Sequence, residues 1–312
     1  MKILVTGAGG FIGSLLIPKL LDLNHNVHVL ERFVTARYVA GKQDEVKTVF
    51  GDLRDHSAVR MIIRDIQPEI VIHLAAISPV AYSYDQPVEV LETNFLGTVH
   101  LAESCLREAH NFKQFLFAGS SEEYGNQEKL PVNELAELRP NSPYAISKAS
   151  ADKYLQYMRD AYGFPITILR NFNTYGRKDN AQFVVERTIV QMLQGKTLQL
   201  GDPKPIRDLV YVDDHVNSFL SCLDNTKAIG NIFNFCTSHG IMIGDLVELI
   251  RNLTDFDGEI IWNTVPARPL DIMKMIGDYS KAKQTLGWKP KFTLEEGLKL
   301  TIESWKNKLP KD

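Results

Sequence analysis

The sequence of 312 residues lacks the features of several large classes of protein. It contains no apolar run near the roughly 18 residues that a membrane-spanning helix needs. It also lacks the basic start and long apolar core of a signal peptide. Its 35 lysines and arginines nearly balance 38 aspartates and glutamates, which leaves a net charge of −3. Since no basic excess is present, we expect a cytoplasmic protein with neither a membrane nor a nucleic acid as partner.

Cysteine is scarce as well. The chain has three cysteines, Cys105, Cys222 and Cys236, which lie far apart within apolar stretches. An odd number at such spacings fits neither a disulfide framework nor a metal site. We expect buried free thiols in a reducing compartment and no bound metal.

Glycine, in contrast, is concentrated at the start of the chain. A short apolar run at 3–5 is followed by a turn that contains Gly7, Gly10 and Gly13, and then by helical leucine spacing over 14–23. A glycine turn between a strand and a helix lets backbone N–H groups and the helix dipole hold a pyrophosphate. The first two glycines stand one residue further apart than in the common G-x-G-x-x-G pattern. The alternative is that the glycines serve only a tight turn.

Apolar strands and helices then alternate regularly as far as residue 175. The expected strands are 3–5, 27–30, 46–50, 70–74, 114–118 and 166–169, and helical patterns occupy 56–66, 88–109 and 143–162. This order predicts an α/β fold, a Rossmann-type doubly wound parallel sheet. Beyond 175 the pattern loosens, with helices expected at 181–195, 213–224, 243–254 and 294–307 and a strand at 232–236. We therefore expect a dinucleotide-binding domain over 1–175, with returning segments at about 206–240. The rest of 176–312 should form a smaller, interleaved substrate-binding lobe.

Residues that end the expected strands are candidates for the ligand site, because ligands bind at the carboxyl ends of such sheets. Glu31 could accept hydrogen bonds from an adenosine ribose, which favours NAD over NADP. The neighbouring Arg32 keeps NADP open, since a guanidinium could hold a 2′-phosphate; a solvated Glu–Arg surface pair is the plainer alternative. Asp52 could accept from the adenine amino group or could cap the helix that follows.

Further candidate residues lie at the end of the fourth strand and after it. His73 is expected to be a packed histidine, while Ala75 and Ala76 are small enough for a flat cofactor to lie close. Asn94 falls inside a predicted helix, where asparagine is unfavourable. Either it faces solvent or its amide organises buried backbone near the site.

The strongest chemical signal joins the end of the fifth strand to the next helix. Ser120 and Ser121 follow the strand, and Tyr144 and Lys148 stand four residues apart on one helical face. A nearby ammonium group would lower the pKa of the Tyr144 phenol from about 10, making it a general base for a sugar hydroxyl. An ordinary amphipathic helix start is the alternative.

These residues resemble the extended short-chain dehydrogenase/reductase family, in the branch that acts on nucleotide-diphosphate sugars. The resemblance spans the chain: TGAGGFIG at 6–13, GDLRD at 51–55, HLAA at 73–76, GSSEEYG at 119–125, PYAISK at 143–148, RNFNTYG at 170–176, RDLVYVDD at 207–214 and LGWKPKFTLEEGL at 286–298. It implies that Ser120 binds the reacting oxygen, that Tyr144 moves the proton at sugar C4, and that Lys148 binds the nicotinamide ribose. The cofactor set thus comprises Gly7, Gly10, Phe11, Ile12, Gly13, Glu31, Arg32, Asp52, Leu53, Leu74, Ala75, Ala76, Asn94, Tyr144 and Lys148. The substrate set comprises Ser78, Ser83, Asn173, Arg207 and Arg268, of which the arginines suit a diphosphate.

The resemblance narrows the reaction to a few types. Ser121 and Glu122 match a pair that helps remove water in the dehydratases of the family, whereas a 4-epimerase needs no acid at 122. We expect a 4-epimerase or 4,6-dehydratase that works through a 4-keto intermediate, with an NDP-4-keto-6-deoxy-sugar reductase as alternative and a non-catalytic dinucleotide sensor as a remote one. Arg177 departs from the family's usual Y-G-P. The family also implies a homodimer formed through helices near 93–109 and 143–162.

Overall fold

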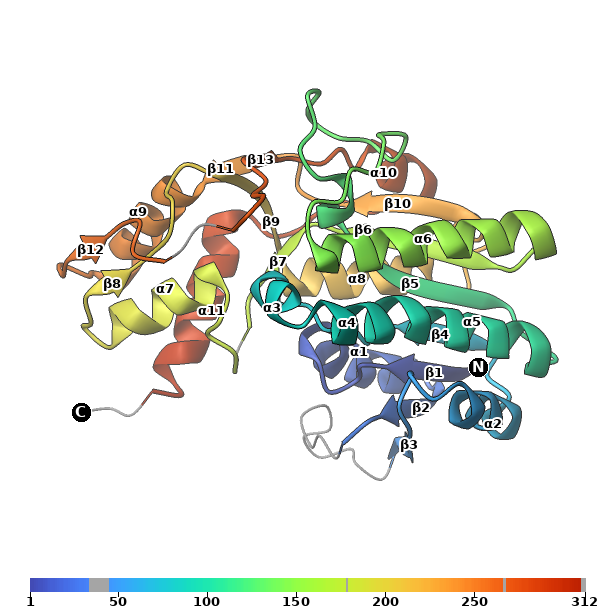
Figure 1. Ribbon diagram of the computed structural model, residues 1–312. Coiled ribbons are helices and arrows are strands. Elements are labelled where there is room, and N and C mark those ends of the chain that lie inside the picture. Colours follow the sequence, from blue (N-terminus) through green and yellow to red (C-terminus); the bar gives the residue numbers. More distant parts are fainter. Residues whose placement is uncertain (34–44, 178, 266–267, 310–312) are drawn as a thin grey trace.

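Seven parallel strands form the main sheet of the computed structural model, which describes residues 1–33, 45–177, 179–265 and 268–309 (Figure 1). Their order across the sheet is β10-β6-β5-β4-β1-β2-β3. The bounds are β1 (Lys2–Thr6), β2 (Asn26–Glu31), β3 (Lys47–Phe50), β4 (Ile70–His73), β5 (Gln114–Ser120), β6 (Ile166–Asn171) and β10 (Asn231–Phe235). The direction of strand addition reverses between β1 and β4, the position at which such sheets bind ligands. The predicted Rossmann-type sheet is confirmed.

Alternation along β1 explains why both faces of the sheet are covered. Ile3 and Val5 belong to one hydrophobic cluster and Leu4 to another, as the two-residue period of a strand requires. Helices α1 (Phe11–Asp22) and α8 (Val212–Cys222) cover the first face, and α2 (His56–Ile66), α5 (Gly97–Glu108) and α6 (Pro143–Tyr162) cover the second (Figure 1).

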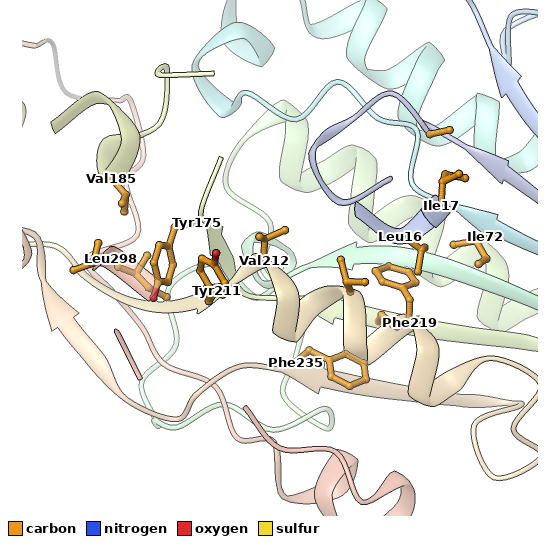
Figure 2. Packing of buried hydrophobic residues seen from close by; sticks show 14 of the residues in the cluster. Leu16, Ile17, Ile72, Tyr175, Val185, Tyr211, Val212, Phe219, Phe235 and Leu298 are labelled. Atoms are coloured by element: carbon orange, nitrogen blue, oxygen red, sulfur yellow. The ribbon is translucent and has the colours of Figure 1, made fainter. Parts of the chain in front are cut away.

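The first cluster continues beyond the sheet into the C-terminal part of the chain. Figure 2 shows Leu16 of α1 near Phe219 of α8, with the packed side chains extending to Tyr175, Tyr211 and Leu298. The C-terminal elements are β7 (Asn173–Tyr175), α7 (Val184–Leu193), β8 (Leu198–Gln199), β9 (Ile206–Tyr211), β11 (Gly240–Met242), α9 (Ile243–Thr254), β12 (Ile260–Ile261), β13 (Lys274–Met275), α10 (Ser280–Leu286) and α11 (Leu294–Lys306). One apolar core therefore joins the sheet to these elements.

Several of these elements differ from the sequence predictions. Within the expected returning segment 206–240, α8 and β10 join the main layers, but β9 forms a separate sheet with β7, β11 and β13. The helix expected over 88–109 is a run of α4 (Pro87–Leu91), the π-helical turn η3 (Glu92–Leu96) and α5, and α3 (Val80–Asp85) precedes it. The short strands were not predicted, because two or three residues carry no detectable alternation.

Cys105, Cys222 and Cys236 are free and buried, as expected. In the described part of the chain, no helix combines the length and the apolar character needed to cross a membrane. The same residues contain no group of histidine, cysteine and acidic side chains that could hold a metal ion.

Gly13→Ala should destabilise the fold, because a Cβ at this position would lie 2.4 Å from the Gly7 carbonyl oxygen and 2.6 Å from that of Ala8. We expect the free energy of unfolding to fall by about 1–3 kcal/mol or more, as for other overpacking substitutions. Gly201→Ala is the matched control, because no atom lies within 4 Å of its added Cβ. Denaturant unfolding of the two variants would contradict this packing if it gave equal midpoints.

Candidate functional site

The glycine turn between β1 and α1 is shaped to accept a phosphate group. Gly7 has a φ of +70°, and a Cβ there would meet the backbone nitrogen of Ala75 at 2.6 Å. Gly10 caps α1 without a side-chain hydrogen bond, and the first turn of the helix carries no acidic residue. The N–H groups and positive dipole end of α1 are therefore available to an anion.

Glu31 lies beside this turn at the end of β2. Its side chain is buried, and its Oε1 atom accepts a hydrogen bond from the backbone N–H of Gly9 at 2.9 Å. Arg32 instead faces Glu89, with 3.9 Å between Nη1 and Oε1, and stacks on Phe33. The alternative of a solvated Glu31–Arg32 surface pair is therefore wrong.

Asp52 and Leu53 follow β3. Asp52 accepts hydrogen bonds from Arg54, 2.9 Å from its backbone N–H and 2.6 Å from Nη2, and these bonds lower the pKa of the carboxyl group. The N-cap of α2 is Asp55, which accepts from the Ala58 N–H at 3.0 Å, so the alternative that Asp52 caps this helix is wrong. Leu53 is buried.

His73 is a packed histidine, as predicted. Nδ1 lies 2.7 Å from the hydroxyl of Thr6 and Nε2 lies 2.9 Å from that of Thr98, and burial lowers its pKa to about 3. The ring is therefore neutral at physiological pH. The Thr6 hydroxyl also accepts from the N–H of Ala75 at 3.2 Å, which fixes the start of the Leu74–Ala75–Ala76 segment.

Asn94 organises buried backbone, the second of its two alternatives. It is 1% exposed in the π-helical turn, accepts from the Ile77 N–H at 2.8 Å and donates to the Ile77 carbonyl at 3.0 Å. It also donates to the Ser147 hydroxyl at 3.1 Å. Asn94 thus ties the loop after β4 to α6, beside Lys148.

Ser120, Tyr144 and Lys148 come together where β5 ends. All three are buried, with 7%, 9% and 3% of their surface exposed. Tyr144 is in the first turn of α6, which Ser142 caps by accepting from the Ala145 N–H at 3.1 Å. The Tyr144 phenol lies near Ser120, which acts to lower the pKa of the phenol, and the Lys148 ammonium donates to the Ala118 carbonyl at 2.9 Å.

The pKa of Tyr144 differs from the sequence prediction. Burial raises it above the ordinary value, and Ser120 and the charge of Arg177 only partly oppose this effect. Burial also lowers the pKa of Lys148 to about 8, with Glu123 acting in the other direction. The expectation that Lys148 lowers the phenol pKa is therefore wrong for the protein by itself, because desolvation outweighs the effect of a neighbouring charge.

The predicted substrate residues form a charged group near Glu122. Burial raises the pKa of Glu122, and Arg207 and Arg268 oppose that shift. Both arginines also face Asp271, at 3.2 Å from Arg207 and 3.8 Å from Arg268. Two guanidinium groups that share one carboxylate can hold a further anion.

The remaining predicted residues differ in their surroundings. The Oδ1 atom of Asn173 is buried and has no hydrogen-bond partner among the residues that the structure describes. Ser121 is buried, and Ser83 donates to the Val80 carbonyl at 2.6 Å within α3, while Ser78 is exposed. The Ser83 hydroxyl thus already has a partner inside its own helix.

Arg177 stands out in the sequence only because it departs from the family's usual Y-G-P. Its guanidinium carbon lies 4.5 Å from the ring centre of Phe11 and 3.6 Å from that of Phe183. Its ion pair with Glu186, at 3.6 Å, links this cation to α7. Arg177 therefore connects the start of α1 with the C-terminal elements, a contact that sequence spacing cannot reveal.

Comparison with known proteins gives consistent matches along the chain. Residues 4–301 match the family model described as GDP-mannose 4,6 dehydratase. A dTDP-glucose 4,6-dehydratase from Escherichia coli is 31% identical, with 97% of this chain and 92% of that protein covered. The structure of a UDP-glucose 4-epimerase from Thermotoga maritima with UDP-glucose has a TM-score of 0.91 and 34% identity, covering 99% of this chain and 100% of that one. The Thermus thermophilus UDP-glucose 4-epimerase in complex with NAD has a TM-score of 0.88 and 29% identity, again covering 99% and 100%.

Asn94→Ala should loosen the loop after β4, because it leaves the part-buried N–H and carbonyl of Ile77 without their side-chain partner. We expect a loss of about 1–3 kcal/mol of unfolding free energy. Hydrogen exchange at the Ile77 amide should become faster. Asn252→Ala, at an exposed position of α9, is the control and should change neither quantity. Unaltered exchange at Ile77 in Asn94→Ala would contradict the anchoring role.

Proposed function

Because the chain belongs to the GDP-mannose 4,6-dehydratase family of extended short-chain dehydrogenases/reductases, we propose that Ser120, Tyr144 and Lys148 assist NAD in oxidising C4 of a nucleotide-diphosphate sugar. The enzyme is NAD-dependent and of the 4-epimerase/4,6-dehydratase type, as its relatives are. The observation that carries the assignment of residues is that Ser120, Tyr144 and Lys148 are buried together at the carboxyl end of β5. The arrangement suits removal of a proton from a sugar hydroxyl.

The residues present fit NAD. The glycine turn approaches Ala75 too closely for any Cβ, and the uncapped start of α1 suits the pyrophosphate. Glu31, at the end of β2, is proposed to accept from the ribose hydroxyls, and its carboxylate would repel a 2′-phosphate, which supports NAD over NADP. Bound NAD supplies the hydride acceptor at C4 together with a positively charged ring. Arg32, Asp52, Leu53 and Ala76 are proposed to complete the adenosine and nicotinamide contacts.

Tyr144 is proposed to move the C4 proton, with Ser120 holding the same oxygen. Since burial raises the pKa of the phenol, the protein by itself keeps Tyr144 protonated at neutral pH. Lys148, with a pKa of about 8, is still mainly an ammonium group at pH 7. A further positive charge near the phenol is therefore needed for Tyr144 to act as a base, which couples proton removal to the oxidised form of the cofactor.

Glu122 separates the two reaction types. Its raised pKa suits an acid or base that takes a proton at C5 and returns one during loss of water, with Ser121 beside it. A 4-epimerase would use Ser120 and Tyr144 alone. The burial of Glu122 and its position opposite Arg207 and Arg268 favour the dehydratase, while the 34% identity to a 4-epimerase favours the epimerase.

The substrate's diphosphate is proposed to bind Arg207 and Arg268, which give bidentate charge-assisted hydrogen bonds and release Asp271. The unpartnered Oδ1 of Asn173 supports a contact with the same substrate. Ser78 and Ser83 are retained as sugar contacts only from the family resemblance. The reductase alternative has less support, since the most similar relatives named above are epimerases and a dehydratase. A non-catalytic dinucleotide sensor also has less support, because Ser120, Tyr144 and Lys148 are all present.

We also propose a cytoplasmic homodimer. Leu96 of η3 and Ile146 and Tyr157 of α6 are exposed apolar residues, at 42%, 44% and 50%. They lie on the adjoining helices that are expected to form a four-helix bundle with a second copy. The buried free thiols support a reducing compartment.

Tyr144→Phe should lower turnover by about 10²–10⁴-fold, the usual contribution of a general acid–base group. The fold should be unchanged, since the ring remains in its buried position. Tyr162→Phe, at the exposed end of the same helix, should retain full turnover. Turnover is measured with each of UDP-, GDP-, CDP- and dTDP-hexoses, and product masses separate isomerisation from loss of water. Equal rates for the two variants would exclude the proposed proton shuttle.

Glu122→Gln tests the dehydratase reaction in deuterated water with a hexose that is turned over. For a dehydratase, wild-type protein should yield a product that is lighter by one water and carries deuterium at C5. The variant should show neither the loss of water nor the label at C5. For an epimerase, wild type and variant alike should yield an unlabelled isomer. A dehydrated, C5-labelled product from the variant would rule out Glu122 as the C5 base.

A further inference from the structure

Glu123, the residue next to Glu122, has no part in the mechanism above, yet it is fully buried beneath the site. Its Oε1 atom accepts a hydrogen bond from the Ser120 backbone N–H at 2.6 Å. The Ser120 hydroxyl in turn accepts from the Glu122 N–H at 3.2 Å, so the two side chains cap the short helix η4 (Ser121–Tyr124). Glu123 therefore fixes the backbone from which Ser120 reaches Tyr144.

The second oxygen of Glu123 has a different environment. Oε2 is buried and has no hydrogen-bond partner in the part of the chain that the structure describes. The nearest cation is Arg170, whose Nε lies 3.5 Å away but donates to Asp152 at 2.9 Å. The same Nε atom of Arg170 therefore faces one oxygen of each carboxyl group, and both Glu123 and Asp152 are fully buried. Two ionised carboxylates cannot hydrogen-bond to each other, so a hydrogen bond between Glu123 and Asp152 needs a proton.

The groups around Glu123 and Asp152 also favour a pair that holds one proton. Lys148 faces the pair from α6, Arg170 from β6, and the hydroxyl of Tyr124 from η4. The Lys148 ammonium is directed to the Ala118 carbonyl, and in the described residues no ion pair joins it to Glu123. Arg170 is thus shared by two carboxyl groups, and burying a second, unpaired negative charge would be costly.

We propose that Glu123 is a positioning residue that is uncharged at neutral pH: it shares one proton with Asp152 and holds the Ser120 backbone through its carbonyl oxygen. The oxygen that lacks a donor then becomes the donor itself, from Oε2 to Asp152. Burial and the charge of Asp152 raise the pKa of Glu123 well above the ordinary range, in agreement. The proposal rests on the proposed function only for the role of Ser120.

Glu123→Gln is the decisive variant, because an amide can accept from Ser120 and donate to Asp152 as the protonated acid does. If the native pair holds a proton that the unfolded chain releases above a pH of about 4.3, wild-type stability falls relative to the variant as pH rises. The ratio of the two unfolding equilibrium constants should change about tenfold per pH unit from pH 5 to 7. A ratio that does not change with pH would contradict the proposal that Glu123 and Asp152 share a proton. This outcome does not depend on whether the protein turns over any sugar.

Kinetics test the positioning role separately. Glu123→Gln should keep kcat, KM and the pH profile of wild type within about twofold, since geometry and charge are preserved. Glu123→Met removes the acceptor of the Ser120 N–H and should lower kcat roughly tenfold to a hundredfold with little change in KM. Glu128→Gln, at an exposed position, is the matched control and should match wild type in both experiments. A Gln variant with a displaced pH profile, or a folded Met variant with wild-type kcat, would contradict the proposal.

Discussion

The contact between the ends of β1 and β4 is the constraint on which the rest of the site depends. The backbone of Gly7 lies so close to that of Ala75 that no side chain fits between them. This approach places the open N-terminus of α1, the loop after β4 and the end of β5 along one edge of the sheet. Asn94 extends the same edge by joining Ile77 to α6, which carries Tyr144 and Lys148. The glycine turn and the proposed catalytic residues are thus held by backbone packing.

Burial determines the electrostatics at this edge. It raises the pKa of Tyr144 and of Glu122 and lowers that of Lys148, so each group is shifted toward its neutral form. Groups in this condition respond strongly to any charge that a ligand brings, because little solvent screens it. The protein alone therefore does not prepare Tyr144 as a base. We propose that the positive charge of the oxidised cofactor activates Tyr144.

The sequence predicts the alternating strands and helices of the main sheet but misses the short strands of the C-terminal part. The apolar runs of β1, β2 and β4–β6 are long enough to show a parallel sheet, and the glycine and Tyr–Lys spacings locate the cofactor turn and the start of α6. The sheet around β9 was not predicted because the strands that pair with β9 are two or three residues long.

The prediction of a lowered Tyr144 pKa was wrong because sequence spacing shows that two side chains are close but not how far they are desolvated. The sequence leaves open whether Asp52 caps α2, and only the structure shows that Asp55 is the cap. The roles of Arg177 and Glu123 depend on contacts between distant segments.

The central claim is that a hydride leaves C4 of the sugar and returns to C4 in an epimerase, or to C6 in a 4,6-dehydratase, without exchange with solvent. A nucleotide sugar carrying deuterium at C4 tests this directly. We predict a slower turnover than with the unlabelled sugar and retention of the deuterium in the product, because the label travels as a hydride on tightly held NAD. Appearance of the deuterium in the water, with an unlabelled product, would contradict the account.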